Sequence, residues 1–314
     1  MARFLIKRLI SVIAVLFAIS VLTFLIFQAI PNGDPAVRLA GKLATQSEIQ
    51  DVRQQWGFDK PLPVQYVKTM QQIFSGKVVS YTQQVNVLQQ IKQDLPATLS
   101  LAIGAGIIWF SLGVLFGVLS AVKAGRFLDR FLTVLALVGV STPVFFLGAL
   151  MLYYLGYKFS IFPNGGYVKL TSNPWQWFTH LVMPWAALSV LFIGVYSRVL
   201  RSTMLDTINE DFVRAARAKG ISERRVLIRH VLRNSMIPII SLFGLDFAAV
   251  IGGGAILTES VFGLQGVGQY AAESINRLDI PPVLVITMLT AFVVVVLAAV
   301  VDIIYAYLDP RIRL

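Results

Sequence analysis

The stretch Leu9–Ile30, LISVIAVLFAISVLTFLIFQAI, decides the fold class, because it carries no charged side chain and is long enough to cross a bilayer. A transmembrane helix needs about 20 consecutive apolar residues. The preceding RFLIKR, residues 3–8, is basic, as at the start of a secretory signal peptide. The apolar run exceeds the roughly 7–15 residues of such a peptide, however, and no A-x-A-like cleavage site follows. We therefore predict a retained transmembrane helix.

The composition of the chain extends this interpretation to a multi-pass membrane protein. Of 314 residues, 56% are hydrophobic and 14% are charged, and the mean hydropathy is +0.73. Soluble domains carry about 25% charged residues. Further apolar stretches predict, with Leu9–Ile30, an all-α membrane protein of six transmembrane helices. These stretches are Leu99–Val122, Phe131–Tyr154, Leu181–Leu200, Ile237–Leu257 and Pro281–Tyr307.

The distribution of Lys and Arg orients the predicted helices. Most of the 27 basic residues fall in segments that share a side with the N-terminus, whereas only Lys158, Lys169 and Arg277 fall in the short loops opposite. Cytoplasmic loops collect basic residues, and segments longer than about 60 residues translocate regardless of charge. We therefore predict that both termini are cytoplasmic and that the protein lies in the cell membrane. The same rule explains the net charge of +11 without nucleic-acid binding.

This orientation divides the chain into four parts. Residues 1–30 form a cytoplasmic tip and the first span, and residues 31–98 form an extracytoplasmic segment. Residues 99–307 form the core of five spans, with a cytoplasmic loop at 201–236, and residues 308–314 form a cytoplasmic tail. The outer segment is either a cap on the bundle, a docking surface or a lid, and Ser47–Trp56 within it is predicted to be an amphipathic helix.

The sequence carries no recognisable motif for catalysis or cofactor binding. It has no cysteine and only His180 and His230, so thiolate and histidine metal sites are not expected. The phosphate-binding pattern G-x-x-x-x-G-K-[ST] is absent. GVGQYA, Gly266–Ala271, matches a dinucleotide fingerprint by letters but lacks the preceding strand that the fingerprint requires. We expect no enzymatic activity, no cofactor and no metal.

Small residues and one proline shape the predicted spans. Ala102, Gly106, Gly113 and Gly117 lie close to one helical face, and small residues at such spacing let helix backbones approach closely. Pro143 should kink the third span because it lacks an N–H group. Gly252, Gly253 and Gly254 should loosen the fifth. Ordinary packing explains these features, and they also suit helices that rock between two arrangements.

Asp246 is the one carboxylate that lies clearly within a predicted span. Intramembrane acids often mark ion or proton pathways. The alternative, which we favour, is that Asp246 bonds to a neighbouring helix or lines an aqueous cavity. Pro143 and Asp246 are therefore the candidate pore or gating residues.

The segment DFVRAARAKG, Asp211–Gly220, lies in the predicted cytoplasmic loop 201–236, the most basic loop on that side. As a helix, it places an aromatic and two small residues on one face and ends at a glycine, and a second helix, Ser222–Leu232, follows with Ser222 as its N-cap. A short helix of this kind suits docking into a groove of another protein, and a charged surface loop is the alternative. The candidate docking residues are Asp211, Phe212, Arg214, Ala215, Ala216, Arg217, Lys219 and Gly220.

ARAKGISERRVLIRHVLRNSMIP, Ala216–Pro238, resembles the cytoplasmic loop of permease subunits of peptide- and nickel-type ABC importers. The wider pattern is E-A-A, three residues and Gly, followed by a more distant Pro. Ala215, Ala216 and Gly220 match it, Arg214 replaces the glutamate, and Pro238 lies farther from the glycine, as is usual for the peptide-type branch. The resemblance covers nearly the whole chain, through Ile30–Ala36 (IPNGDPA), Gly57–Tyr66 (GFDKPLPVQY), Val261–Tyr270 (VFGLQGVGQY) and Leu308–Arg313 (LDPRIR).

The resemblance implies a type I ABC importer permease fold. It implies a homologous second permease, so that the pore lies between two chains in the lipid bilayer. It also implies two cytoplasmic ABC ATPases whose grooves receive the helix around Ala215, and an extracytoplasmic solute-binding protein that delivers a di- or oligopeptide. The same architecture serves nickel or metallophore complexes and glutathione. A stand-alone secondary transporter or channel is disfavoured, because the chain shows no internal repeat and only one buried acid.

Overall fold

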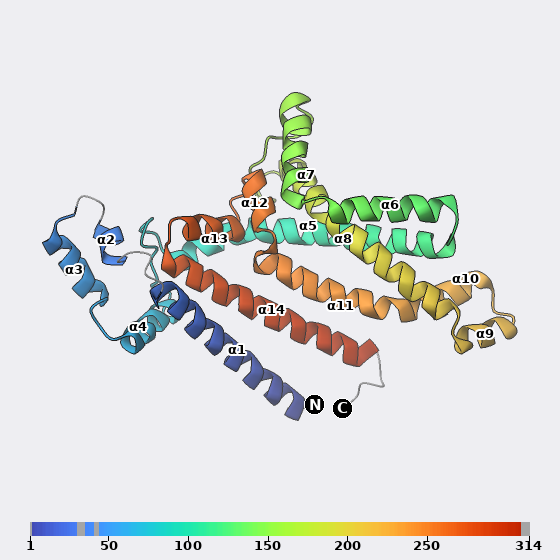
Figure 1. The fold of residues 1–314 in the computed structure, drawn as a ribbon, viewed down its shortest axis with the longest axis horizontal. Helices are drawn as coiled ribbons and strands as arrows, with labels where there is room; N and C mark the ends of the chain where they lie inside the picture. The colour runs from blue at the N-terminus through green and yellow to red at the C-terminus, as the bar shows by residue number, and fades with distance from the viewer. Residues whose placement is uncertain (1, 30–34, 41–43, 309–314) are drawn as a thin grey trace.

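The structure, a computed structural model, describes residues 2–29, 35–40 and 44–308. Within those ranges the chain is helical, with one isolated antiparallel bridge between Val79 and Asn86. Figure 1 shows an elongated bundle. Helix α9 (Asp211–Ala218) lies at the right-hand end of it, and the start of α1 (Ala2–Ala29) and the end of α14 (Ile280–Leu308) lie at its lower edge, nearer the middle. That both termini share the cytoplasmic side with the basic loop stays a prediction.

Four described helices are long and apolar enough to cross a membrane. They are α5 (Val87–Val122), α8 (Pro174–Ile208), the continuous helix Glu223–Gly254, and α14 over Ile280–Val300. The bent pair of α6 (Phe127–Ser141) and Val144–Lys158 makes a fifth if it counts as one span, and the described apolar stretch of α1, Ile10–Ile26, is shorter. An all-α multi-pass membrane protein is therefore confirmed, and the number of six spans stays a prediction.

Glycine contacts set the distance between α5 and α8. A Cβ atom on Gly113 would lie 2.6 Å from Cβ of Tyr196, and one on Gly117 would lie 2.8 Å from Cβ of Leu200. Neither position can hold a larger residue without moving α8. The predicted close approach at these glycines is confirmed, whereas Gly106 packs against the Phe247 ring of α11 (Arg233–Ala249).

Pro143 breaks the third predicted span, as expected. Helix α6 ends at Ser141, and α7 (Val144–Met151) leaves at 96° to it and continues into the π-helical turn η1 (Leu152–Lys158). Thr142 is extended, with φ −90° and ψ 119°, because the proline ring disfavours the helical conformation of the residue before it. The predicted kink is confirmed, and in Figure 1 α7 projects from the side of the bundle.

The fifth span begins earlier than its apolar stretch suggests. The predicted second helix begins at Glu223 after Ser222, as expected, but it does not end at Leu232. It runs from α10 (Glu223–Arg225) through the π-helical turn η2 (Val226–Leu232) into α11. The turn η3 (Val250–Gly254), where Gly253 has φ 125°, then ends the helix at the predicted glycines.

The outer segment forms short helices at the end of the bundle opposite α9 (Figure 1). They are α2 (Pro35–Ala40), α3 (Gln46–Trp56) and α4 (Leu62–Phe74), and α3 confirms the predicted amphipathic helix. Thr45 and Glu48 form a capping box at its start, and the hydrogen bond from the Thr45 backbone lowers the pKa of Glu48.

A buried apolar cluster holds this outer segment on the bundle. Ile73 of α4 and Val78 of the following turn pack with Tyr270 of α13 (Val267–Asn276) and Leu284 of α14. These contacts attach the segment to α13 and to the start of α14, and its role as a cap, a docking surface or a lid stays a prediction. Of the family-like stretches, most of Ile30–Ala36 and of Leu308–Arg313 lies outside the described residues.

Candidate functional site

Helix α9 is the exposed element that the sequence singled out. It begins at Asp211, whose negative charge suits a helix N-terminus, and ends at Ala218. Gly220 has φ +73° and donates its N–H to the carbonyl oxygen of Arg217 at 2.9 Å. The predicted helix and its glycine stop are therefore present.

The two faces of α9 differ from the predicted arrangement. Val213 and Ala216 are buried, at 0% and 6% exposure, in the core that contains Val226 of η2 and Met204 of α8. Ala216 thus anchors α9 to its own chain, although Phe212, Ala215 and Ala216 were predicted to share one docking face. Val213, three residues before Ala216, completes this inner face, and sequence reasoning missed it because periodicity does not show which face points inward.

Phe212 and Ala215 remain on the outer face of α9. Phe212 is 42% exposed although it is aromatic, and Ala215 is also exposed. They lie one turn apart, so they form one small apolar surface. Nothing else in the described structure covers it. We call Phe212 and Ala215 the outer face.

Two basic side chains of α9 pair with groups close to them in the sequence. Arg214 Nη2 donates to the carbonyl oxygen of Asn209 at 2.9 Å and its Nη1 lies 3.3 Å from Asp211. Arg217 Nε donates to Glu223 at 2.8 Å, which links α9 to the helix that follows it. All of these side chains are substantially exposed, so the pairs contribute little to stability. Their effect is to hold the Arg214 guanidinium group at the start of α9 and the Arg217 guanidinium group at the helix that follows.

Hydroxyl groups join α8 to the fifth span close to α9. Ser235 Oγ donates to Thr207 Oγ1 at 3.1 Å, and Thr207 Oγ1 donates to the carbonyl oxygen of Thr203 at 2.6 Å. Ser235 is also buried, at 1% exposure. The inner face of α9 packs in the same buried cluster as Met204 of α8 and Val226 of η2, so α9 contacts both of the helices that it connects.

An ion pair that sequence reasoning missed holds the turn between α5 and α6 on α8. Arg201 Nε and Nη2 donate to the two carboxylate oxygens of Asp129 at 2.7 and 2.8 Å. The Gly125 N–H donates to the same carboxylate at 2.8 Å, and the Ser120 hydroxyl donates to it as well. Asp129 is 3% exposed, so this bidentate contact is largely shielded from water.

The candidate pore residues lie apart from each other along the chain and in different helices. Asp246 of α11 accepts a hydrogen bond from the Tyr196 hydroxyl of α8 at 2.9 Å. The favoured expectation that this acid bonds to a neighbouring helix is confirmed. Pro143 lies at the bend between α6 and α7. A pore or gating role for either residue stays a prediction.

A buried carboxylate at the outer end was also missed. Glu259 of α12 (Ile256–Phe262) is 0% exposed. It accepts hydrogen bonds from Thr98 Oγ1 at 2.6 Å and from the Gln269 N–H at 2.9 Å. Burial raises the pKa of Glu259, and these hydrogen bonds oppose that shift. Gly266 and Gly268 lie so close to the carboxylate that side chains there would collide with it. Glu259 therefore holds the loop between α12 and α13 against α5.

Asp279, just before α14, binds the outer segment in a similar way. It is 1% exposed. Its carboxylate accepts hydrogen bonds from the Tyr81 N–H at 2.9 Å, from Thr82 Oγ1 at 2.7 Å and from the Ser80 hydroxyl. Burial, with the nearby Asp279 charge, raises the pKa of Tyr81. Among the described residues, no group of three or more His, Cys, Asp or Glu side chains could hold a metal ion.

Comparison with known families identifies the family of the chain. Residues 113–314 match the family described as binding-protein-dependent transport system inner membrane component, and residues 1–102 match the N-terminal region of such membrane components. The chain belongs to this family. The resemblance to ABC importer permeases is therefore confirmed, and this family member is a multi-pass inner-membrane protein.

Individual relatives match over their full length. The chain is 36% identical over 314 residues to a probable peptide ABC transporter permease protein, y4tP, of Sinorhizobium fredii, covering 100% of both chains. It is 35% identical to the dipeptide transport system permease protein DppB of Lactococcus lactis, again covering 100% of both. It is 34% identical to the probable D,D-dipeptide transport system permease protein DdpB of Escherichia coli, covering 98% of this chain and 96% of that one.

A solved structure supports the fold. An inward-facing structure of the MetNI methionine ABC transporter matches with a TM-score of 0.55 at 16% identity, and the match covers 71% of this chain and 97% of that chain. At this identity the likeness concerns the fold alone. The fold is that of an ABC transporter permease.

Proposed function

We propose that this permease forms half of the translocation pore of an ATP-driven, binding-protein-dependent importer of di- and oligopeptides. The names of its relatives, which are peptide and dipeptide permeases, support the substrate class. The observation that carries the proposal is the construction of α9. Its inner face, Val213 and Ala216, is anchored in the bundle, while its outer face, Phe212 and Ala215, is uncovered.

The outer face supplies the contact for the motor in this proposal. A groove of a cytoplasmic ATPase subunit receives Phe212 and Ala215, and Arg214 and Arg217 of the same helix make charge-assisted contacts to acidic groups of that subunit. Closure of the ATPases on ATP displaces α9. The hydroxyl contacts between α8 and α11 pass that displacement to both helices. A second, homologous permease completes the pore, and a solute-binding protein delivers the peptide from the outside.

Variants on the outer face test this coupling. We expect Ala215→Glu to abolish peptide-stimulated ATP hydrolysis and uptake in proteoliposomes, because a larger anionic side chain stands where the groove must close. Ala215 is exposed, so membrane insertion and the melting temperature should not change. Ala216→Asp and Gly220→Trp are poorer tests, since Ala216 is buried and Gly220 has a positive φ.

Phe212→Ala and Phe127→Ala form a matched pair. Both phenylalanines are exposed, at 42% and 83%, and Phe127 is the first residue of α6, away from α9 in sequence. Phe212→Ala should reduce coupling and Phe127→Ala should not. Normal peptide-stimulated ATPase activity in Ala215→Glu would refute the proposed role of α9. An uptake panel of peptides, nickel complexes and glutathione with the cognate binding protein tests the substrate class separately.

A further inference from the structure

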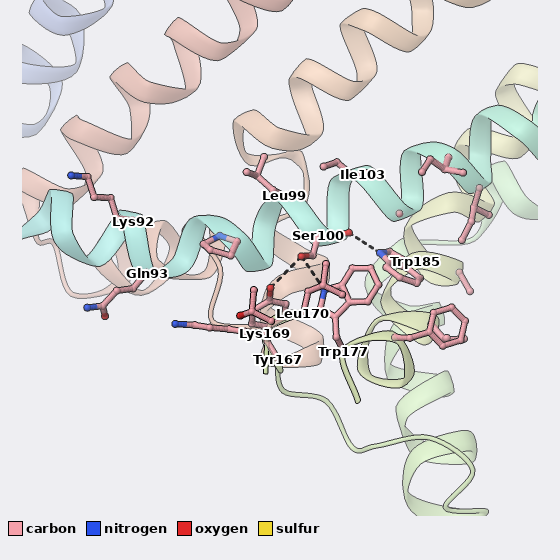
Figure 2. A pocket seen from close by; sticks show the side chains of 18 of the residues that line it. Lys92, Gln93, Leu99, Ser100, Ile103, Tyr167, Lys169, Leu170, Trp177 and Trp185 are labelled. Atoms are coloured by element: carbon pink, nitrogen blue, oxygen red, sulfur yellow. Dashed lines mark hydrogen bonds between the residues drawn. The ribbon is translucent and has the colours of Figure 1, made fainter. Parts of the chain in front are cut away.

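A large cavity lies on a different side of the molecule from α9. Its volume is about 1110 Å³, and it lies between the first half of α5, the first part of α8 and the loop around Lys169 (Figure 2). Leu99, Ile103 and Ile107 of α5 face Phe178, Val182 and Ala186 of α8 across it. Neither Pro143 nor Asp246 lines it.

The polar groups of the cavity wall are bonded to one another. Trp177 Nε1 donates to Ser100 Oγ at 3.1 Å, and this hydroxyl lies 3.2 Å from Tyr167 Oη. Trp185 Nε1 donates to the carbonyl oxygen of Ser100 at 2.9 Å, and Gly104 provides the space for its indole ring. Figure 2 shows the contacts of Tyr167, Trp177 and Trp185 converging on Ser100 of α5.

This bonding makes the inner wall unsuited to a peptide. A peptide backbone carries a donor and an acceptor at most residues, and each needs a partner when it is buried. The aromatic rings and aliphatic side chains of the wall provide few free partners. Hydrocarbon chains need none, so the lining favours an occupant made of hydrocarbon.

The length of the inner lining is close to the thickness of one leaflet of a membrane. Beyond the residues nearer the start of α5, the inner lining of α5 runs from Leu99 to Ile108, and the lining of α8 runs from Trp177 to Ala186. At 1.5 Å per residue each wall is about 14 Å long. Half of a hydrocarbon core is about 15 Å thick. Trp177 lies at the polar end of the cavity, where aromatic residues mark a membrane interface.

The mouth of the cavity is positively charged. Lys92 and Lys169 line it together with Gln89 and Gln93, and no Asp or Glu is among the described residues that line it. Both lysines are exposed. In Figure 2 Lys92 and Gln93 lie on α5 at the end remote from Trp185, and Lys169 extends towards the same end. A mouth of this kind complements a phosphate group.

We propose that this cavity binds an anionic phospholipid. The acyl chains occupy the space between Ile103 and Val182, and the headgroup phosphate contacts Lys92 and Lys169. The assignment to the outer leaflet rests on the proposed orientation of the chain, but the binding itself does not. Each lysine near an anionic surface strengthens binding about 5-fold, so the two together favour an anionic over a zwitterionic lipid by about 25-fold.

Tryptophan fluorescence tests the proposal on the full chain with its co-purifying subunits. Trp56→Phe and Trp175→Phe leave Trp177 and Trp185 as reporters in the cavity. Trp109 also remains, and it is buried. The protein is placed in nanodiscs that contain brominated phosphatidylglycerol or brominated phosphatidylcholine, whose chains quench a tryptophan on contact. Phosphatidylglycerol should reach half-maximal quenching at a mole fraction at least 10-fold lower than phosphatidylcholine.

Variants separate the headgroup from the chains. Lys92→Gln with Lys169→Gln should remove the preference, whereas Lys158→Gln, at an exposed lysine outside the cavity, should keep it. Ala186→Phe should reduce quenching by both lipids because it fills the cavity. The single Lys92→Gln and Lys169→Gln variants change only exposed side chains, so they give a readout even if the double variant is unstable.

Three results would overturn the proposal. They are equal quenching by the two lipids, a preference that survives without both lysines, and complete protection of the reporters by an added dipeptide or by the partner permease. Peptide uptake is measured on the same samples. Failure of lipid binding with normal uptake would overturn the lipid site and leave the proposed function intact. Loss of uptake with normal lipid preference would count against the proposed function and leave the lipid site intact.

Discussion

Replacing Asp129 should loosen the turn between α5 and α6 from α8. The carboxylate accepts two charge-assisted hydrogen bonds from Arg201 at 2.7 and 2.8 Å and one from the Gly125 N–H at 2.8 Å. Removing one partner of a buried ion pair costs about 3–5 kcal/mol. The Arg201 side chain is 33% exposed, so water partly solvates it when it is unpaired. We therefore expect Asp129→Ala to lower the free energy of unfolding by about 3 kcal/mol, at the lower end of that range.

Asp129→Asn should cost less, about 2 kcal/mol, because the amide keeps one oxygen acceptor but loses the charge. Arg201→Lys should cost about 1 kcal/mol, because a lysine cannot reproduce the bidentate contact. The measurement is a titration with sodium dodecyl sulfate in mixed micelles, followed by circular dichroism. Phe127→Ala, in the same first turn of α6 as Asp129 but 83% exposed, is the control and should change the free energy by less than about 0.5 kcal/mol.

A double-mutant cycle between Asp129 and Arg201 isolates the pair. Residues in direct contact show interaction energies of about 0.5–3 kcal/mol, and we expect at least 1 kcal/mol here. Additive effects of Asp129→Ala and Arg201→Ala would refute the reasoning. An Asp129→Ala variant as stable as the parent would do so as well, because the turn would then be held by apolar packing alone.

Three further predictions follow from the helix contacts and the outer carboxylates. Gly117→Leu should collide with Leu200 and lower the melting temperature, and an unchanged melting temperature would contradict the close approach of α5 and α8. Burial raises the pKa of Glu259 above its ordinary 4.5, so the folded protein should lose stability as the pH rises from about that value through the raised pKa. Glu259→Gln should flatten this dependence of the melting temperature on pH, measured by thermal unfolding between pH 4 and 8. Asp279→Ala should speed amide hydrogen exchange over residues 78–86 by about 10-fold or more, since four hydrogen bonds to that loop are lost, and unaltered exchange would show that the apolar cluster suffices.

Local features of the sequence predicted much of this fold. The apolar stretches located the membrane-spanning helices, because a helix in lipid must satisfy its backbone hydrogen bonds within itself and present apolar side chains to the lipid. Pro143 marked the bend, Gly220 marked the end of α9, and Gly113 and Gly117 marked the approach to another helix. The effects of proline and glycine on the backbone act within a turn or two of the residue, so the neighbouring residues in the sequence suffice to predict them.

The functional contacts needed the tertiary structure. Glu259 bonds to Thr98 and Asp279 bonds to Ser80, which lie 161 and 199 positions away in the sequence, and nothing local indicates these partners. Helical periodicity showed that α9 has faces, but only the packing against η2 decided that Ala216 points inward while its neighbour Ala215 points out. The composition and order of residues thus determined a bundle of membrane helices, whereas the choice of partner for each buried charge depended on which helices the folded chain brings within hydrogen-bond distance.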